Sequence, residues 1–283
     1  MTATTSFLQG ATQTLYARWT EHTYTITYTK NATDAQIDKT SENFTILTSI
    51  TMATTTRTGY QMSGWLVTSN GGNWGVVNSQ KYSNGQSGIK GMYGNVTLTA
   101  QWTANTYTIA FNANAGTGTM NSVTARYGQT VTLPANTYTR TGYSFTGWAK
   151  SAGGTKVYND SAQVSNLSSS NNATVTLYAC WTAKTYTLVF DSNGGSAVAS
   201  VSGKVYDTTY GTLPSPTRAG YDFQGWFNTE TSNNGSGTLV RSDSRFNTTT
   251  ATLANVPLVT TLTCNQTETL VPLANLSNVH VTL

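Results

Sequence analysis

Few residues in this sequence could support catalysis. The two histidines, His22 and His280, lie near opposite ends of the 283-residue chain, and neither stands beside a candidate nucleophile. A Ser–His or Cys–His mechanism needs three groups brought together, so we expect both histidines to be surface or interface residues. The eleven acidic residues show no recurring pair of the kind that glycosidases use. The sequence therefore predicts a protein that is not an enzyme.

Metal and cofactor binding also find no support. The only cysteines are Cys180 and Cys264, whereas a structural zinc site needs four ligands. Their separation favours free or intermolecularly paired thiols over an internal disulfide, which requires Cα atoms within about 7 Å. The segment Asp191–Gly195 lacks the spacing and the distal Glu of a calcium loop and is better explained as a turn. We expect no metal and no cofactor.

One group of aromatic residues could bind a ligand. Trp74 is the one tryptophan outside the repeated motifs described below, and with Tyr82 and Tyr93 it could form a platform for sugar rings. The alternative, which the sequence favours, is that these side chains pack a long loop against the rest of its repeat. The first interpretation predicts a carbohydrate- or receptor-binding module that contacts surface glycans.

The amino-acid composition indicates which class of protein this is and where it is located. Charged residues are 9% of the chain, against about 25% in ordinary soluble domains. The net charge of +4 is small and the Lys and Arg residues are scattered, which is not the pattern of a nucleic-acid-binding protein. No apolar run reaches the ~18–20 residues of a membrane helix, and no signal sequence follows Met1. A surface of hydroxyls and amides is typical of extracellular β-proteins, so we expect an extracellular or cell-surface protein, either processed or a segment of a longer chain.

Two landmarks recur with one period. The motif RTGYSFTGW ends at Trp148 and has near-copies that end at Trp65 and Trp226, so the tryptophans are 83 and 78 residues apart. A second element, TLYARW, TLTAQW or TLYACW, ends at Trp19, Trp102 and Trp181, with spacings of 83 and 79 residues. Two independent landmarks with the same spacing indicate tandem repeats of about 80 residues.

The sequence pattern predicts that each repeat is a set of short strands. Apolar residues alternate in the TLxAxW element, which predicts a closing strand, and an opening strand follows at Tyr24, Tyr107 or Tyr186. The links between repeats are very short, which predicts restricted orientations of neighbouring units. Gly142 is expected in a tight bend and Gly147 in a bulge or close approach. Helical periodicity is weak, and at most one short helix per repeat, such as Ala35–Asn43, is expected.

The recurrent aromatic residues are predicted to form the core of each unit. The expected core residues are Tyr60, Trp65, Trp102, Tyr143, Phe145, Trp148, Trp181, Tyr221, Phe223 and Trp226. The predicted division of the chain is 1–22, the closing strand of an incomplete or preceding repeat; 23–103, 104–182 and 183–264, three repeats; and 265–283, a tail or strand.

These motifs resemble the Listeria–Bacteroides repeat, the B-repeat family of internalin-type and other bacterial surface proteins. The resemblance covers residues 14–264, although the first repeat lacks the YG–x–LP element and the last has Gln266 where the closing tryptophan is due. It implies mainly β, β-grasp-like modules with a short or vestigial helix, in the extracellular stalks and adhesive regions of bacterial proteins. The family has no shared catalytic site, so no catalytic residue is carried over.

The predicted function is that of a non-enzymatic extracellular structural or adhesive protein. It would be a surface stalk, with adjoining repeats of a longer chain as its partners, or a subunit of a head-to-tail filament made of copies of itself. In a filament, an unpaired strand would add to a repeat of the neighbouring subunit. The residues expected in such inter-subunit strands are Leu15, Tyr16, Trp19, Val279, Val281 and Leu283.

Overall fold

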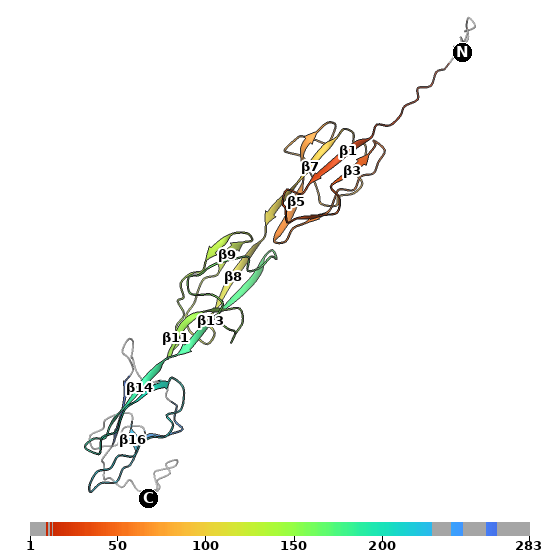
Figure 1. Ribbon diagram of the computed structural model, residues 1–283. Helices are drawn as coiled ribbons and strands as arrows, with labels where there is room; N and C mark the ends of the chain where they lie inside the picture. The colour runs from red at the N-terminus through yellow and green to blue at the C-terminus, as the bar shows by residue number, and fades with distance from the viewer. Residues whose placement is uncertain (1–9, 11, 13, 228–238, 246–258, 265–283) are drawn as a thin grey trace. The chain divides into compact units, whose positions relative to one another are not determined.

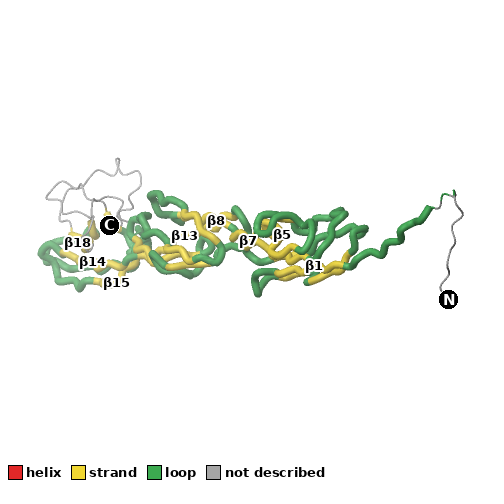
Figure 2. The backbone as a smooth tube through the Cα atoms, turned by 90° about the horizontal axis from the view of Figure 1, so that it is seen from above, coloured by secondary structure: helices red, strands yellow, loops and turns green. Residues whose placement is uncertain are grey.

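The computed structural model describes residues 10, 12, 14–227 and 239–245, and the backbone of residues 259–264. Within these residues the regular structure is made of β-strands, and no helix is present. Figure 2 shows the same absence of helix in the described part of the chain. The mainly β class is therefore confirmed, whereas the β-grasp topology remains a prediction.

The first sheet has five strands in the order β3-β1-β7-β5-β6 (Figure 1). Strand β1 pairs in parallel with β7, and the other neighbours are antiparallel. A separate pair joins β2 (Gln36–Ile37) to β4 (Thr55–Thr56). The strands of the sheet are β1 (Tyr24–Thr29), β3 (Ser41–Phe44), β5 (Tyr60–Asn70), β6 (Lys81–Tyr82) and β7 (Val96–Ala104).

The second sheet has four strands in the order β11-β13-β8-β9. Its hairpin β8–β9 is antiparallel, as is the pair β11–β13. Strands β10 (Thr130–Thr132) and β12 (Gln163–Ser165) form a separate antiparallel pair. The strands of the sheet are β8 (Thr106–Asn112), β9 (Val123–Arg126), β11 (Tyr143–Ala149) and β13 (Ala173–Ala183).

The third sheet has five strands in the order β15-β14-β18-β16-β17. Strand β18 occupies the position that β7 has in the first sheet, because it pairs in parallel with the opening strand β14 and antiparallel with β16. The strands are β14 (Thr185–Asp191), β15 (Val201–Val205), β16 (Trp226–Phe227), β17 (Leu239–Val240) and β18 (Val259–Cys264).

The chain divides into two compact units, and the division passes through β8 and β13. One unit contains residues 1–109, 123–132 and 163–175, and the other contains residues 110–122, 133–162 and 176–283. The link between the first two sheets therefore lies inside one unit, and the link between the second and third sheets lies inside the other.

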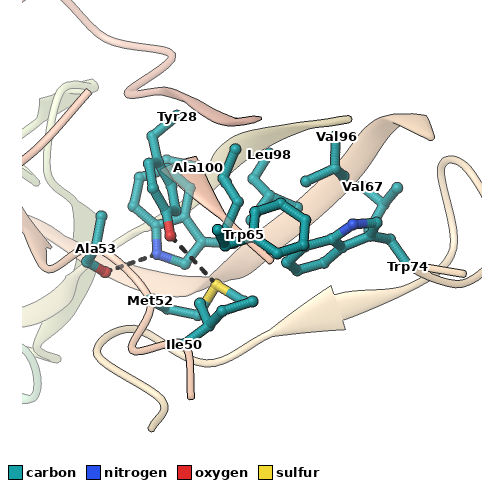
Figure 3. Close-up of a cluster of buried hydrophobic side chains, with 12 residues drawn as sticks. Tyr28, Ile50, Met52, Ala53, Trp65, Val67, Trp74, Val96, Leu98 and Ala100 are labelled. Carbon is teal, nitrogen blue, oxygen red and sulfur yellow. Dashed lines mark hydrogen bonds between the residues drawn. The ribbon is translucent and has the colours of Figure 1, made fainter. Parts of the chain in front are cut away.

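Alternating side chains build the core of the first sheet. In β1, Ile26 and Tyr28 are buried while the alternating Thr27 and Thr29 are exposed, which is the periodicity of a strand with one buried face. Around them pack Trp65, Trp74 and the apolar residues of β7 (Figure 3). The Trp65 indole also donates a hydrogen bond of 2.9 Å to the Ala53 carbonyl, so its polar atom is satisfied inside the core.

In the first and second sheets the glycine that precedes the core tryptophan forms a bulge. The register of β11 on β13 shifts between Phe145 and Gly147, and Gly147 has φ +142°. A Cβ at this position would lie 2.4 Å from the Tyr158 carbonyl oxygen. The bulge expected at Gly147 is therefore confirmed.

Two predicted elements are absent. Residues 35–43, proposed as a short helix, form β2 and part of β3 instead, because these backbones pair with β4 and β1. Thr14–Trp19, proposed as a closing strand, has no regular secondary structure. An isolated strand is not stable without a partner for its backbone groups, and this segment has none of the strand neighbours that β7 has.

Candidate functional site

The predicted core residues differ in exposure. Trp65, Trp148 and Trp226 are at most 1% exposed. Tyr60, Trp102, Tyr143, Phe145, Trp181 and Phe223 are half-buried.

Tyr221 departs from the core prediction. Its side chain is 47% exposed, and it lies under the Arg218 guanidinium on the surface. The motif that carries Tyr221 is the same as in the other repeats, but no described residue covers Tyr221 as a neighbour covers the other two tyrosines.

The half-buried tryptophans close the turns that follow the opening strands. The Trp102 indole donates to the Lys30 carbonyl at 2.8 Å, and the Trp181 indole donates to the Ala113 carbonyl at 2.9 Å. These bonds fasten the end of each closing strand to the start of its own repeat.

The proposed ligand platform is not formed. Trp74 is fully buried, its ring meets the Phe44 ring edge-on, and its indole N–H donates to the Gly94 carbonyl at 2.9 Å. The Tyr82 hydroxyl donates to the Trp74 carbonyl at 2.8 Å, whereas Tyr93 is 46% exposed. The three side chains therefore share no open face, and the packing alternative is the correct one.

The described residues offer little reactive chemistry. Burial raises the pKa of the Cys180 thiol, an effect only partly opposed by the charge of Lys156, so the nucleophilic thiolate is disfavoured. No group of three or more His, Cys, Asp or Glu side chains in the described residues is arranged to hold a metal ion. The second cysteine, Cys264, has no described side chain, and His280, Val279, Val281 and Leu283 lie outside the described residues.

A shallow hollow of about 300 Å³ lies beside the β2–β4 pair, lined by residues 36–38 and 54–56. Its one carboxylate, Asp38, accepts 2.9 and 2.8 Å hydrogen bonds from the Thr54 amide and hydroxyl. Partial burial favours the neutral acid, but these bonds outweigh it and lower the pKa of Asp38. The carboxylate is thus engaged within its own loop.

The feature that recurs in the structure is the motif Arg-x-Gly-Tyr, which we call the RxGY motif. Its copies are Arg57–Tyr60, Arg140–Tyr143 and Arg218–Tyr221. In each, the tyrosine amide donates to the arginine carbonyl at 3.0 to 3.2 Å, and the glycine has φ between +75° and +81°. This is the left-handed conformation that a tight turn assigns to glycine. The guanidinium carbon lies 3.7 to 4.3 Å from the centre of the tyrosine ring, a cation–π contact that orients both side chains.

The first RxGY motif holds the following repeat at the link residue Asn105. The Asn105 amide donates to the Gly59 carbonyl at 2.9 Å, and the Asn105 carbonyl accepts from the Tyr127 amide at 2.9 Å. The Tyr127 ring lies against Gly59 and meets the Tyr60 ring edge-on, with centres 5.8 Å apart. The link and the turn that follows β9 are thus fixed to the end of the first sheet.

The second RxGY motif repeats this arrangement with different link chemistry. The Lys184 amide donates to the Gly142 carbonyl at 2.8 Å, and its carbonyl accepts from the Tyr206 amide at 2.9 Å. The Tyr206 ring lies against Gly142 and meets the Tyr143 ring edge-on at 5.6 Å. Because the backbone makes the same bonds with Asn or Lys in the link, the geometry depends on glycine and the two tyrosines.

Glycine is required in both places for two reasons. A Cβ on Gly59 would lie 2.2 to 2.4 Å from ring carbons of Tyr127, and a Cβ on Gly142 would lie 2.2 to 2.3 Å from those of Tyr206. These distances are far below van der Waals contact. The positive φ adds strain for any other residue.

Sequence reasoning missed the role of the second tyrosine in each contact. Tyr127 and Tyr206 each stand twenty residues after the opening tyrosine, Tyr107 or Tyr186. This constant offset is a signal in the sequence, but it predicts only a turn after a hairpin strand. Which neighbour the turn touches depends on the link, where a single residue separates the closing and opening strands.

Comparison with known proteins agrees with the repeat pattern. A sequence profile of the Listeria-Bacteroides repeat domain matches residues 24–101, 107–180 and 186–254. The matches leave the link residues Asn105 and Lys184 between consecutive copies. The family resemblance expected from the motifs is thereby confirmed.

Two relatives come from Evansella cellulosilytica. One, named "Putative Gly-rich membrane protein", is 29% identical over 230 residues, which is 80% of this chain and 25% of the relative. The other, named "Putative membrane protein", is 28% identical over 221 residues, which is 77% of this chain and 30% of the relative. The chain thus spans between a quarter and a third of each relative. In the part of the chain that the structure describes, no helix is long and apolar enough to cross a membrane.

Proposed function

This chain belongs to the Listeria-Bacteroides repeat family, and on that basis we propose that it is a non-enzymatic structural or adhesive protein of the bacterial cell surface. Its repeats act as a stalk that carries other parts of a longer polypeptide away from the envelope. The names of the two relatives, both membrane proteins, support a location at the envelope.

The observation that carries this proposal is the pair of contacts at the RxGY motifs. A stalk must resist bending where one module meets the next, and flexible linkers do not provide that resistance. Here the single link residue, Asn105 or Lys184, is bonded through its own backbone to both neighbours. A tyrosine ring seated on a glycine adds aromatic contact at each site.

The distance that the protein extends from the cell envelope tests this function. An antibody against the described repeats should label intact cells of the source organism. Deletion of one complete repeat, residues 104–182, should keep the label on the surface and bring it closer to the envelope in immunogold images. Labelling that appears only after lysis would contradict a surface stalk. An unchanged distance between the label and the envelope after the deletion would also contradict it.

A filament of identical subunits is the second form of this function, and one observation favours it. Leu15, Tyr16 and Trp19 are 81%, 86% and 91% exposed, although in β7 and β13 the leucine of the same motif is buried and its tryptophan is half-buried. A segment of this composition gains most by adding to the sheet of another subunit. In the third sheet β18 occupies that position, so an added strand would have to displace it.

Hydrogen exchange measured at rising protein concentration tests strand addition. The amides of residues 14–20 should become protected as concentration increases if the segment enters a neighbouring sheet. Exchange that stays fast at every concentration would exclude this form while leaving the stalk proposal intact.

A further inference from the structure

The third RxGY motif presents the same surface as the other two, and no described residue covers it as Tyr127 and Tyr206 cover the others. Arg218 lies over the Tyr221 ring at 4.3 Å, and Gly220 has φ +81°. A Cβ on Gly220 would meet no atom within 4 Å, and Tyr221 is 47% exposed. At Gly59 and Gly142 the corresponding space is filled by a tyrosine ring.

The first repeat carries the complementary turn. In the second and third sheets the covering tyrosine follows the second strand of the hairpin, within a turn closed by hydrogen bonds from Gln129 to Arg126 and from Thr208 to Val205. In the first sheet the same turn is closed by a bond of 3.0 Å from the Thr48 amide to the Thr45 carbonyl. The equivalent positions follow from the strand registers, which pair Tyr24 with Phe44, Tyr107 with Ala125 and Tyr186 with Lys204.

This register places Ile46 where the other repeats have Tyr127 and Tyr206. We call Ile46–Leu47 the leading turn. Ile46 is 47% exposed and Leu47 is 74% exposed. Two adjacent aliphatic side chains at the tip of a turn thus lie open to solvent, at the position where the other two repeats have a half-buried tyrosine packed on glycine.

We propose that the third RxGY motif binds the leading turn of a second copy of this chain. The proposal rests on the proposed structural function and names the partner that its repeats bind. Ile46 would lie against Gly220 and beside the Tyr221 ring, as Tyr127 lies against Gly59 and beside Tyr60. Successive contacts of this kind join opposite ends of the repeat array and do not pair identical surfaces, so they are heterologous.

The sequence after the third repeat explains why a second copy is the occupant. At both internal junctions the opening tyrosine follows the closing tryptophan by five residues. The corresponding stretch after Gln266 is Val271–Asn275, VPLAN, which has no aromatic residue. Pro272 also lacks the N–H that a paired strand needs. The sequence at this spacing therefore lacks the features of the opening strands that bring a hairpin turn to the first two RxGY motifs.

Substitutions that change the charge or the size of the side chain at position 46 test this proposal. Sedimentation velocity of the full-length protein, up to the highest soluble concentration, should show concentration-dependent association. Ile46→Lys should abolish it, because the lysine would be placed beside the Arg218 guanidinium. Ile46→Tyr recreates the internal contact and should strengthen association roughly threefold to tenfold, as expected for one added aromatic pair.

Matched controls separate docking from general surface effects. Val157 is as exposed as Ile46, at 47%, so Val157→Lys and Val157→Tyr should leave association unchanged. On the other partner, Gly220→Ala should weaken association, whereas Gly153→Ala, at an equally open glycine with φ +71°, should not. Circular dichroism of each variant verifies that the fold is retained.

A folded wild-type protein that stays monomeric at every concentration would overturn the proposal, as would association that is indifferent to Ile46→Lys. Equal responses of the Ile46 and Val157 variants would also overturn it, because they would indicate nonspecific hydrophobic association. None of these results bears on the surface stalk, which is tested by the reach of the protein on cells.

Discussion

At the scale of single residues, the core tryptophans have equivalent positions but unequal hydrogen bonding. The Trp65 indole donates to the Ala53 carbonyl at 2.9 Å and the Trp226 indole donates to the Pro214 carbonyl at 2.7 Å. The buried indole nitrogen of Trp148 has no such partner. Two extra residues lie between the Leu-Pro element and the tryptophan in the second repeat, which moves the equivalent carbonyl out of place.

This difference predicts unequal costs for the same substitution. Trp65→Phe removes one of the two hydrogen bonds that the Ala53 carbonyl accepts, the other coming from the Gly85 amide, whereas Trp148→Phe removes an unsatisfied donor. Beyond the shared loss of ring area, Trp65→Phe should be more destabilising by about 1–2 kcal/mol. Denaturant unfolding of both variants measures the difference, and equal costs would contradict it.

The buried tyrosines predict how stability depends on pH. Burial, and then the hydrogen bond to the Glu42 carboxylate at 2.6 Å, raise the pKa of Tyr28. A folded-state pKa above the unfolded value near 10 means that stability is fully present below about pH 10. It falls as pH rises further, because the unfolded chain loses the proton first.

We therefore expect the free energy of unfolding to decrease above about pH 10, by at most about 1.4 kcal/mol per pH unit for each such tyrosine. Tyr28→Phe should make the decrease shallower than in the wild type. Urea titrations at a series of alkaline pH values measure both slopes. Identical slopes for the wild type and Tyr28→Phe would contradict the assignment.

At the scale of elements, much of the strand pattern could be predicted from the sequence. Period-two alternation identified β1, β8 and β14, because one face of each strand is buried. The pattern failed at Thr14–Trp19, since alternation shows which face a strand would bury but not whether a partner is present. The short helix expected at Ala35–Asn43 is also absent. Pairing of these residues with two other strands outweighs any local preference for a helix.

The RxGY turn is the element on which the junctions depend, and its three copies provide matched substitutions. In Gly142→Ala the new Cβ would clash with the Tyr206 ring, and the positive φ adds backbone strain. Together these effects should lower the free energy of unfolding by about 2–4 kcal/mol. Gly220→Ala meets only the strain, because its Cβ would face open space, and should cost about 1 kcal/mol. Thermal and denaturant unfolding of the two variants compare these costs. A larger loss at Gly220 would contradict the contact described at Gly142.

At the scale of the whole molecule, the repeats could be counted from two spaced motifs, but the contacts between them could not. The sequence identified Gly142 as a bend and Tyr143 as a core residue. The structure confirms the bend at Gly142, and it shows in addition that both residues form part of a surface that contacts Tyr206 of the following repeat. The sequence favoured packing over a ligand platform for Trp74, Tyr82 and Tyr93, but only the structure shows that Trp74 is fully buried.

The central claim is that backbone bonds through the link residue, together with a tyrosine seated on glycine, hold adjacent repeats in one orientation. Pulsed EPR across the first junction tests it most directly. Spin labels at exposed Ser79 and Ser165, with Cys180 and Cys264 changed to serine, should give a single narrow distance distribution. Tyr127→Ala should broaden it, and Tyr93→Ala should not. A broad distribution in the unsubstituted protein, or one that Tyr127→Ala leaves unchanged, would contradict the claim.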